Sequence, residues 1–319
     1  MFRLTAKIEI KSAKTWRFDK VAGVEITRDI DTLTDTCVVT LPKKVRWLGE
    51  SSMPIKRGDE VSVWLGYDGE LQFAFRGFIT TIGLKNPTEI HCEDYMFLFK
   101  SRDAKKFAYK TATIEQVLRD QNLGVKYKVF GEQHIGQFRV TASTVTELLG
   151  QLKDQGGIRS FFRIEDGEPV LYCGVLFERD TKCKQVFATG VNLIDDTQLD
   201  VQNAADVKIK IRAISLRPNN KRIRVDVGDA DGQRRTLHTY NKDEKELKAW
   251  AEQELKRLKR DGLAGSFTTF GAVLIDKLDN IGIKIDGVRR GIYQTDKNVI
   301  KYGTGGFRQE ITIGLRVAE

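Results

Sequence analysis

The chain has 319 residues, of which 40% are apolar and 9% aromatic, and it carries a formal net charge of +9. This length predicts two or three domains, and this composition excludes general disorder. The positive excess is spread along the chain, since residues 191–319 hold 24 Lys and Arg against 19 Asp and Glu. Such interleaving argues against sequence-specific DNA binding, although it leaves open a mildly basic surface that faces a polyanion.

The sequence contains neither the pattern of a membrane span nor that of an export signal. No run of about 18 apolar residues occurs, so no membrane span is expected. Residues 1–11 alternate like a strand and lack the apolar centre of a signal peptide. We therefore expect the protein to stay in the compartment where it is made, unless an assembly carries it elsewhere.

Residues 1–102 are predicted to form short strands, and the clearest of these belong to a hairpin in residues 58–82. The pair Asp68-Gly69 supplies the positive φ that a tight hairpin turn needs. Alternating apolar residues mark the two arms, namely Val61, Val63 and Leu65, then Leu71, Phe73 and Phe75. Gly77 interrupts the second arm, where a barrel corner or a bulge would be tolerated. Strands of this length and spacing predict a small antiparallel barrel or sandwich.

Helical spacing begins after residue 102, and residues 103–190 are predicted to form a compact α+β module. Thr113 is the expected N-cap of a first helix, and Ser143 or Thr144 that of a second helix, which ends at Gly156-Gly157. Two strands follow and are joined by a turn at Asp166-Gly167.

Strand character returns in residues 191–319. One strand is predicted to carry Val207, Ile209, Ile211 and Ala213 on one face and then to change phase to Ile214 and Leu216, as at a bulge. A single amphipathic helix is expected at about residues 243–261, followed by further strands to the end of the chain. The predicted organisation is therefore two β-barrels, residues 1–102 and 191–319, flanking the α+β module of residues 103–190.

The cysteines and histidines predict no metal site and no cofactor. Cys37, Cys92, Cys173 and Cys183 form no Cys-x-x-Cys pair. His91 adjoins Cys92, but neighbouring residues of a strand point to opposite faces. We expect four reduced cysteines that behave as small apolar residues.

Catalytic signatures are also missing from the sequence. His91, His134 and His238 lie in different predicted regions, and no nucleophile elbow, zinc-binding helix or phosphate-binding loop motif occurs. The glycine-rich GTGGFRQ precedes a strand, so a hairpin turn is expected there. Three acidic pairs can be drawn as carboxylate sites, namely Glu93-Asp94, Glu165-Asp166 and Asp195-Asp196. Acids are common at strand ends, so we expect no enzymatic activity.

The ordered set of short motifs resembles the baseplate-hub family of phage tails, which includes late control gene D proteins and the N-terminal hub part of type VI secretion spike proteins. The residues that carry the resemblance are Gly58, Asp59, Gly66, Tyr67, Phe75, Gly77, Cys92 and Asp94, then Gly265, Ser266, Gly271, Gly306 and Arg308. The order of elements also fits, so the resemblance covers nearly the whole chain. It implies that both barrels are of the tail-tube type.

The resemblance further implies a homotrimer whose six barrels form a pseudo-sixfold ring. Such a ring would join a sixfold tail tube to a threefold central spike and line the channel for tape-measure protein and DNA. Contacts to baseplate wedge proteins are implied as well, with a location in the virion tail or baseplate after assembly in the bacterial host cytoplasm. No further segment follows the second barrel, so the spike is expected to be a separate protein.

Two interface candidates and two rival functions complete these expectations. The basic pairs Lys43-Lys44 and Arg289-Arg290 are candidate contacts with neighbouring proteins, against the simpler interpretation as plain surface charge. The rival functions are a cell-wall hydrolase at the tail tip and a carbohydrate- or receptor-binding module.

Overall fold

The computed structural model describes residues 3–45, 47, 52–83, 86–130, 134–174, 177, 182–195, 198–205, 208–217, 221–259, 261–286 and 288–318. The chain divides into two compact units, each built from segments that are distant in sequence. The first unit contains Met1–Phe97, Thr181–Leu199 and Gly265–Glu319, and the second contains Leu98–Asp180 and Asp200–Ala264.

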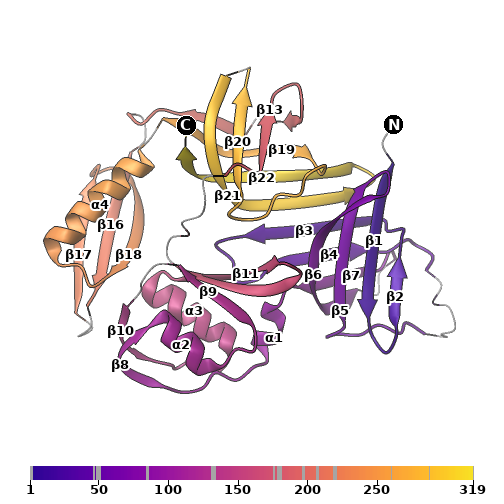
Figure 1. The fold of residues 1–319 in the computed structure, drawn as a ribbon, viewed down its shortest axis with the longest axis horizontal. Helices are drawn as coiled ribbons and strands as arrows, with labels where there is room; N and C mark the ends of the chain where they lie inside the picture. The colour runs from indigo at the N-terminus through magenta and orange to yellow at the C-terminus, as the bar shows by residue number, and fades with distance from the viewer. Residues whose placement is uncertain are drawn as a thin grey trace. The chain divides into compact units, whose positions relative to one another are not determined.

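The first unit is a β structure (Figure 1). Its strands are β1 (Leu4–Lys11), β2 (Thr15–Phe18), β3 (Gly23–Asp29), β4 (Thr36–Thr40), β5 (Glu60–Tyr67), β6 (Glu70–Gly83), β7 (Glu89–Glu93), β13 (Gln185–Ala188), β14 (Leu193–Asp195), β20 (Asn280–Ile285), β21 (Val288–Gly303) and β22 (Gly306–Ala318). Three elements run from one unit into the other, namely α1 (Met96–Lys100), β15 (Leu199–Gln202) and β19 (Gly262–Phe270). The predicted mainly-β class is confirmed.

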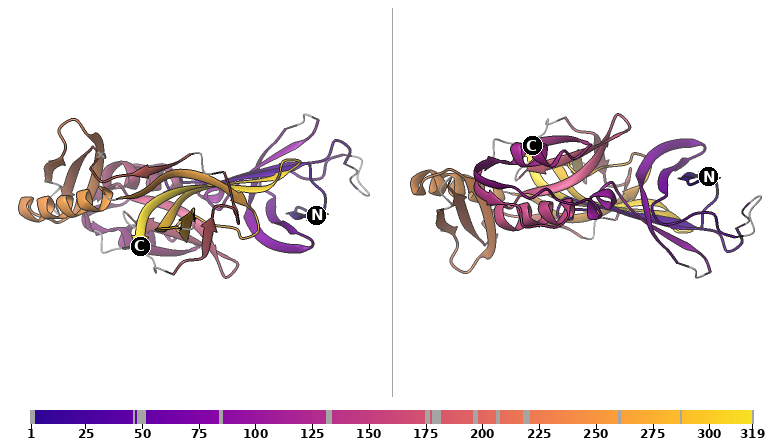
Figure 2. Two further views of the ribbon diagram at one scale, coloured as in Figure 1. Left: turned by 90° about the horizontal axis from the view of Figure 1, so that it is seen from above. Right: turned by 90° about the horizontal axis from the view of Figure 1, so that it is seen from below.

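These strands form one hydrogen-bonded sheet that repeats a strand order. A first series runs β3-β4-β7-β6-β5-β1, and a second runs β14-β19-β22-β21-β20-β13. The two series join where β3 pairs with β21 in antiparallel register from Gly23↔Gly303 to Lys297↔Asp29 (Figure 1). The long strands β21 and β22 twist along their length (Figure 2).

The alternation of side chains gives this sheet one apolar and one polar face. Ile26 and Ile300 lie opposite each other on β3 and β21, and both are fully buried. Their chain neighbours Glu25 and Lys301 also pair, but on the other face, where both are exposed. Successive residues of a strand point to opposite sides, so the sequence pattern alone produces this division.

The hairpin of β5 and β6 has the predicted turn, because Asp68 and Gly69 adopt φ of 51° and 93°. The predicted alternation along the second arm is wrong, however. The register shifts between Val63 and Trp64, so that two adjacent residues of β6, Ala74 and Phe75, are both buried. Leu71 and Phe73 consequently leave the core and are 38% and 36% exposed. The bulge therefore lies at Ala74, whereas the sequence predicted a bulge or corner three residues later, at Gly77.

The second unit contains the predicted helices and several small sheets. Its elements are β8 (Ala108–Thr113), α2 (Ile114–Gln121), β9 (Lys126–Phe130), β10 (His134–Arg139), α3 (Val145–Gly156), β11 (Arg159–Glu165), β12 (Glu168–Gly174), β16 (Ile209–Leu216), β17 (Arg222–Gly228), β18 (Gln233–Tyr240) and α4 (Glu244–Leu258). Thr113 caps α2 as predicted, and Thr144 rather than Ser143 caps α3. Glu147 completes a capping box there, and Gly157 ends α3 in the left-handed conformation.

Helix α4 lies along one face of the sheet β17-β16-β18 (Figures 1 and 2). Its extent confirms the predicted amphipathic helix, with Asp243 as N-cap. The bulge predicted in β16 is wrong. Alternation continues unbroken to Ser215, which is fully buried and bonds through its hydroxyl to the carbonyl oxygen of Lys242. Val207 lies outside the described residues.

Candidate functional site

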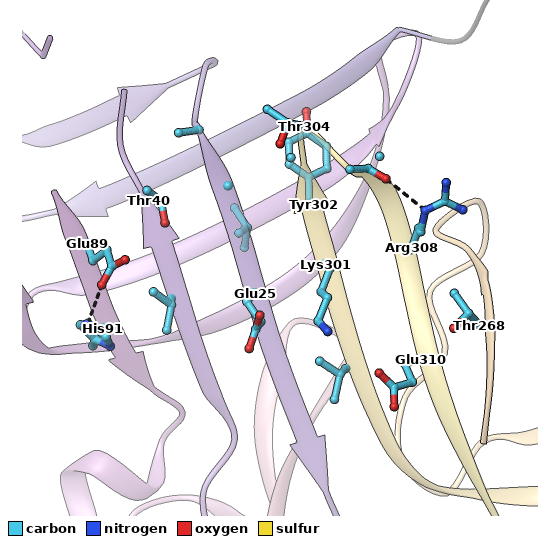
Figure 3. A pocket seen from close by; sticks show the side chains of 18 residues that line it. Glu25, Thr40, Glu89, His91, Thr268, Lys301, Tyr302, Thr304, Arg308 and Glu310 are labelled. Atoms are coloured by element: carbon cyan, nitrogen blue, oxygen red, sulfur yellow. Dashed lines mark hydrogen bonds and ion pairs between the residues drawn. The ribbon is translucent and has the colours of Figure 1, made fainter. Parts of the chain in front are cut away.

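An open groove of about 780 Å³ crosses the polar face of the first unit, over the junction of β3 and β21. Figure 3 shows its side chains rising from β7, β4 and β3 on one side and from β21 and β22 on the other. The lining includes the carboxylates Glu25, Glu89 and Glu310 together with the cations Lys301 and Arg308. The face is therefore polar and of mixed charge, because every second residue of each strand points into it.

The groove contains one histidine, His91, which lies close to a carboxylate. Its Nε2 lies 3.6 Å from Glu89 Oε2, and the two side chains are 43% and 46% exposed. Both groups are thus partly exposed to water, unlike the enclosed groups that catalytic sites use. Cys92, the next residue, is 2% exposed on the opposite face, as predicted.

A buried charged cluster lies at the same junction and was not predicted from the sequence. Lys277 precedes β20, and its side chain is completely buried. Its Nζ donates to Asp35 Oδ1 at 2.6 Å. Asp35 in turn donates its backbone N–H to Asp94 Oδ2 at 3.1 Å, while the N–H of Met96 donates to Asp94 Oδ1 at 3.0 Å. The cluster therefore ties the second series to the ends of β4 and β7 in the first.

The ionisation of these carboxylates is strongly perturbed. Burial, reinforced by the charge of Asp35 and opposed by Lys277, raises the pKa of Asp94 to about 7. Burial also raises the pKa of Asp35, although Lys277 counteracts it. A lysine that compensates two buried carboxylates is a structural requirement of this junction.

Buried amides continue the cluster across the junction. Gln309 accepts the backbone N–H of Ile275 at 2.9 Å and donates to the carbonyl oxygens of Phe270 and Val273. Asn298 donates to Gln309 Oε1 at 2.9 Å. Together these bonds fix the loop between β19 and β20, which carries Lys277.

The glycines named from the family resemblance lie at turns and close approaches. Gly58 and Gly306 adopt φ of 91° and 98° in turns. A Cβ at each of four others would overlap a neighbouring group, namely Gly66 against Glu70, Gly77 against Glu93, Gly265 against Gln198 and Gly271 against the Phe307 ring.

The remaining residues named from the resemblance are mostly structural. Phe75 belongs to the core, and Asp59 accepts the N–H of Lys56 at the turn before β5. Ser266 Oγ donates to Gln198 Oε1 at 2.7 Å. The structure brings two of the named residues near Phe307, since Tyr67 donates its hydroxyl to the Phe307 carbonyl oxygen at 2.8 Å and Arg308 is its chain neighbour.

The basic pairs and acidic pairs do not form a common site within the described residues. Lys43 and Lys44 are exposed beyond the end of β4. The side chains of Arg289 and Arg290 lie outside the described residues, as does Asp196. Among the acids, Asp94 belongs to the buried cluster, whereas Glu165 pairs with Lys128 at the end of β11.

The residues that sequence reasoning missed are Lys277, Asp35 and Asn298, whereas Gln309 was named only as the last residue of the glycine-rich GTGGFRQ. Their signal in the sequence was weak, since Lys277 lies in a segment of mixed apolar and polar residues, VLIDKLDNIGI. A lysine in such a segment resembles an ordinary exposed lysine until the tertiary structure shows its partner, Asp35. None of the helices in the described residues has the length and apolar character needed to cross a membrane.

No protein-family model matches the chain, and no curated protein matches it. Several solved structures, however, do match the chain. The fold is similar to the tail protein from Neisseria meningitidis MC58, with 13% identity, a TM-score of 0.64, and coverage of 97% of this chain and 96% of that one. It is also similar to the 43 kDa tail protein of prophage MuSo2 from Shewanella oneidensis, with 16% identity, a TM-score of 0.61, and coverage of 97% and 98%.

A third similar structure is the E. coli c3393 protein, a component of the type VI secretion system that exhibits structural similarity to the T4 bacteriophage tail proteins gp27 and gp5. Identity is 12%, the TM-score is 0.52, and 94% of this chain and 74% of that chain are covered. The first two similarities extend over nearly the full length of both chains, and together the three confirm the predicted resemblance in fold. The chain has the fold of these phage tail and type VI secretion proteins.

Proposed function

We propose that this protein is the structural hub of a phage-like tail baseplate. In this proposal three copies form a pseudo-sixfold adapter that joins a sixfold tail tube to a threefold central spike. The observation that carries the proposal is the strand order that occurs twice in one chain, with both series in one continuous sheet. A trimer of such a chain contains six similar units, which is what matching sixfold to threefold symmetry requires.

The polar face of the sheet supports a role as channel wall. Lys301 and Arg308 on this face are interspersed with Glu25, Glu89 and Glu310. A strongly basic wall would retain DNA through the release of counterions, whereas a mixed wall lets a polyanion pass. Tape-measure protein would occupy the same channel before DNA does.

The proposed partners follow from this role. They are the tail tube protein on one side of the ring, the central spike protein on the other, and baseplate wedge proteins around it. The proposed location is the tail or baseplate of a phage or a tail-like particle, assembled in the bacterial host cytoplasm. The role is mechanical, and we propose no catalytic residue and no cofactor.

Native mass spectrometry and electron microscopy of the purified full chain test the proposal. The expected species is a trimer that gives ring-shaped class averages with six similar lobes. Coexpression with the central spike protein of the same particle should yield a complex of three hub chains and three spike chains. A protein that stays monomeric up to about 100 µM, alone and with the spike, would contradict the proposal.

A further inference from the structure

The turns that precede β5 and β20 are built in the same way. In the first, the N–H of Lys56 donates to Asp59 Oδ2 at 2.9 Å, and the N–H of Asp59 returns to the Lys56 carbonyl oxygen at 3.2 Å. In the second, the N–H of Asp276 donates to Asp279 Oδ2 at 2.8 Å, and the N–H of Asp279 returns to the Asp276 carbonyl oxygen at 3.1 Å. An aspartate therefore closes each turn through the same two bonds.

The contacts of these turns with the following long strand also match. The N–H of Ile79 in β6 donates to the Asp59 carbonyl oxygen at 2.9 Å, and the N–H of Thr295 in β21 donates to the Asp279 carbonyl oxygen at 2.9 Å. Ile79 in β6 thus corresponds to Thr295 in β21.

The correspondence continues into the next pair of strands. The register between β6 and β7 shifts after Ile79 and resumes at Thr81, and that between β21 and β22 shifts after Thr295 and resumes at Lys297. Two bulges at equivalent positions identify Thr81–Gly83 of β6 as the counterpart of Lys297–Val299 of β21.

Burial of the two turns differs sharply. In the second turn Lys277 and Leu278 are 0% and 1% exposed, and Lys277 donates to Asp35, which precedes β4 of the first series. In the first turn their counterparts Arg57 and Gly58 are exposed. A single chain therefore covers only one of two equivalent surfaces.

The edges of the long strands differ in the same sense. Lys297–Gly303 of β21 pairs with β3. The equivalent edge of β6 at Thr81–Gly83 pairs with β7 on one side, and no strand in the described part of the chain pairs with it on the other. An open edge of this kind is a template for another strand.

The partner for this edge is found by locating the counterpart of β3 in the second series. Val38 of β4 pairs with Glu25 of β3. Ser266 of β19 has the place of Val38 in the second series, and its N–H donates to the carbonyl oxygen of Gln198 at 3.2 Å. Gln198 therefore corresponds to Glu25, and β15, which follows it, corresponds to the second half of β3.

The exposure of β15 agrees with a missing neighbour. Val201 lies three residues beyond Gln198 and so corresponds to Arg28, whose side chain is only 11% exposed at the junction inside the chain. Val201 is 66% exposed, and Ile194 on β14 is 38% exposed. Apolar residues at an open sheet edge indicate a surface that another chain covers.

We infer that a second copy of this chain pairs the open edge of its β15 with the β6 edge at Thr81–Gly83, repeating between chains the β3·β21 junction that exists within one. The inference rests on the proposed hub function and adds its interface. In the register of the internal junction, where Asn298 faces Arg28, Ile82 of one copy faces Val201 of the next. The contact joins two different edges, so it propagates head to tail and closes into a ring.

Cysteine cross-linking of the full chain tests the interface. The variants are Ile82→Cys and Val201→Cys, each in a Cys183→Ser background, because the other native cysteines are buried. Mixing the two single variants should give a cross-linked dimer on oxidation or with a short bismaleimide, and each variant alone should give none. The double variant should give a covalent trimer. Ile82→Cys combined with Val186→Cys is the control, since Val186 on β13 is 52% exposed but lies on neither edge.

Cross-linking of Ile82→Cys with itself would overturn the head-to-tail contact. A trimer in native mass spectrometry without the Ile82–Val201 cross-link would refute this interface and leave the hub proposal intact. A monomer without any cross-link would refute both. As a second measurement, Val201→Lys should weaken trimer formation at least tenfold while the monomer stays folded, whereas Val186→Lys should leave assembly unchanged.

Discussion

Replacing Lys277 by methionine tests the buried cluster that joins the two strand series. The substitution keeps an unbranched side chain of similar length but removes the charge that lies 2.6 Å from Asp35. Asp35 and Asp94 are 7% and 5% exposed, so water cannot replace the lost ammonium group. Breaking a buried ion pair in this way costs about 3–5 kcal/mol of folding free energy.

The loss should depend on pH in a defined direction. The pKa of Asp94 is raised from 3.8 to about 7 in the folded protein, which therefore binds more protons than the unfolded chain between these values. The contribution of this group to stability is thus highest at low pH and falls as the pH rises through 7. Without Lys277 the carboxylate pKa values rise further. The destabilisation of Lys277→Met should then be larger at pH 8 than at pH 5.5. The difference should be about 1.4 kcal/mol for each unit by which the substitution raises a carboxylate pKa within this pH range.

Urea unfolding followed by tryptophan fluorescence measures this effect. Trp16, Trp47 and Trp64 belong to the first unit, and Trp250→Phe removes the signal of the second. Lys284→Met is the matched control, because Lys284 is an exposed lysine on β20 and its loss should change stability by less than about 0.5 kcal/mol. Equal effects of the two substitutions, or a Lys277→Met loss that is the same at both pH values, would refute the reasoning.

Three further substitutions test single contacts. Gly271→Ala should destabilise the first unit by about 1–3 kcal/mol, because the new methyl group overlaps the Phe307 ring, whereas Gly305→Ala, which meets no atom within 4 Å, should be neutral in urea unfolding. Tyr67→Phe removes the hydroxyl that bonds the Phe307 carbonyl oxygen and should cost about 0.5–1.5 kcal/mol; an unchanged urea midpoint would contradict this. Thr144→Ala should lower the thermal stability of the second unit by about 1 kcal/mol through loss of the N-cap bond, and Thr144→Ser should restore it.

Local features were predictable from the sequence because their causes are local. The turn at Asp68-Gly69 requires positive φ, and such pairs are among the few that supply it at low cost. The caps of α2 and α3 follow from hydroxyl side chains placed at the start of a helical stripe. The alternation of strands such as β3 also showed which residues are buried.

Other features depend on contacts between residues far apart in sequence. Because of the bulge at Ala74, the side chains of Leu71 and Phe73 point away from the core instead of into it. The register between β5 and β6, which produces this bulge, is set by cross-strand packing. The pattern of β16 predicts a phase change because the polar Ser215 occupies a buried position. Its bond to Lys242 satisfies the hydroxyl there and is formed only in the folded chain.

By itself, the sequence determined the mainly-β class, the positions of the helices and a resemblance to phage hub proteins, because propensity, periodicity and turn chemistry act over a few residues. The tertiary structure decided that β3 and β21 join the two strand series into one sheet, and that Lys277 is a buried partner of Asp35 across 242 residues. Pairing over such distances is set by the free energy of the whole fold, since the edge of one strand accepts any strand whose register and burial match. For the same reason, the edge of β6 that is unpaired within the described residues is recognised only in the folded chain, by comparison with the equivalent edge of β21, which is paired with β3.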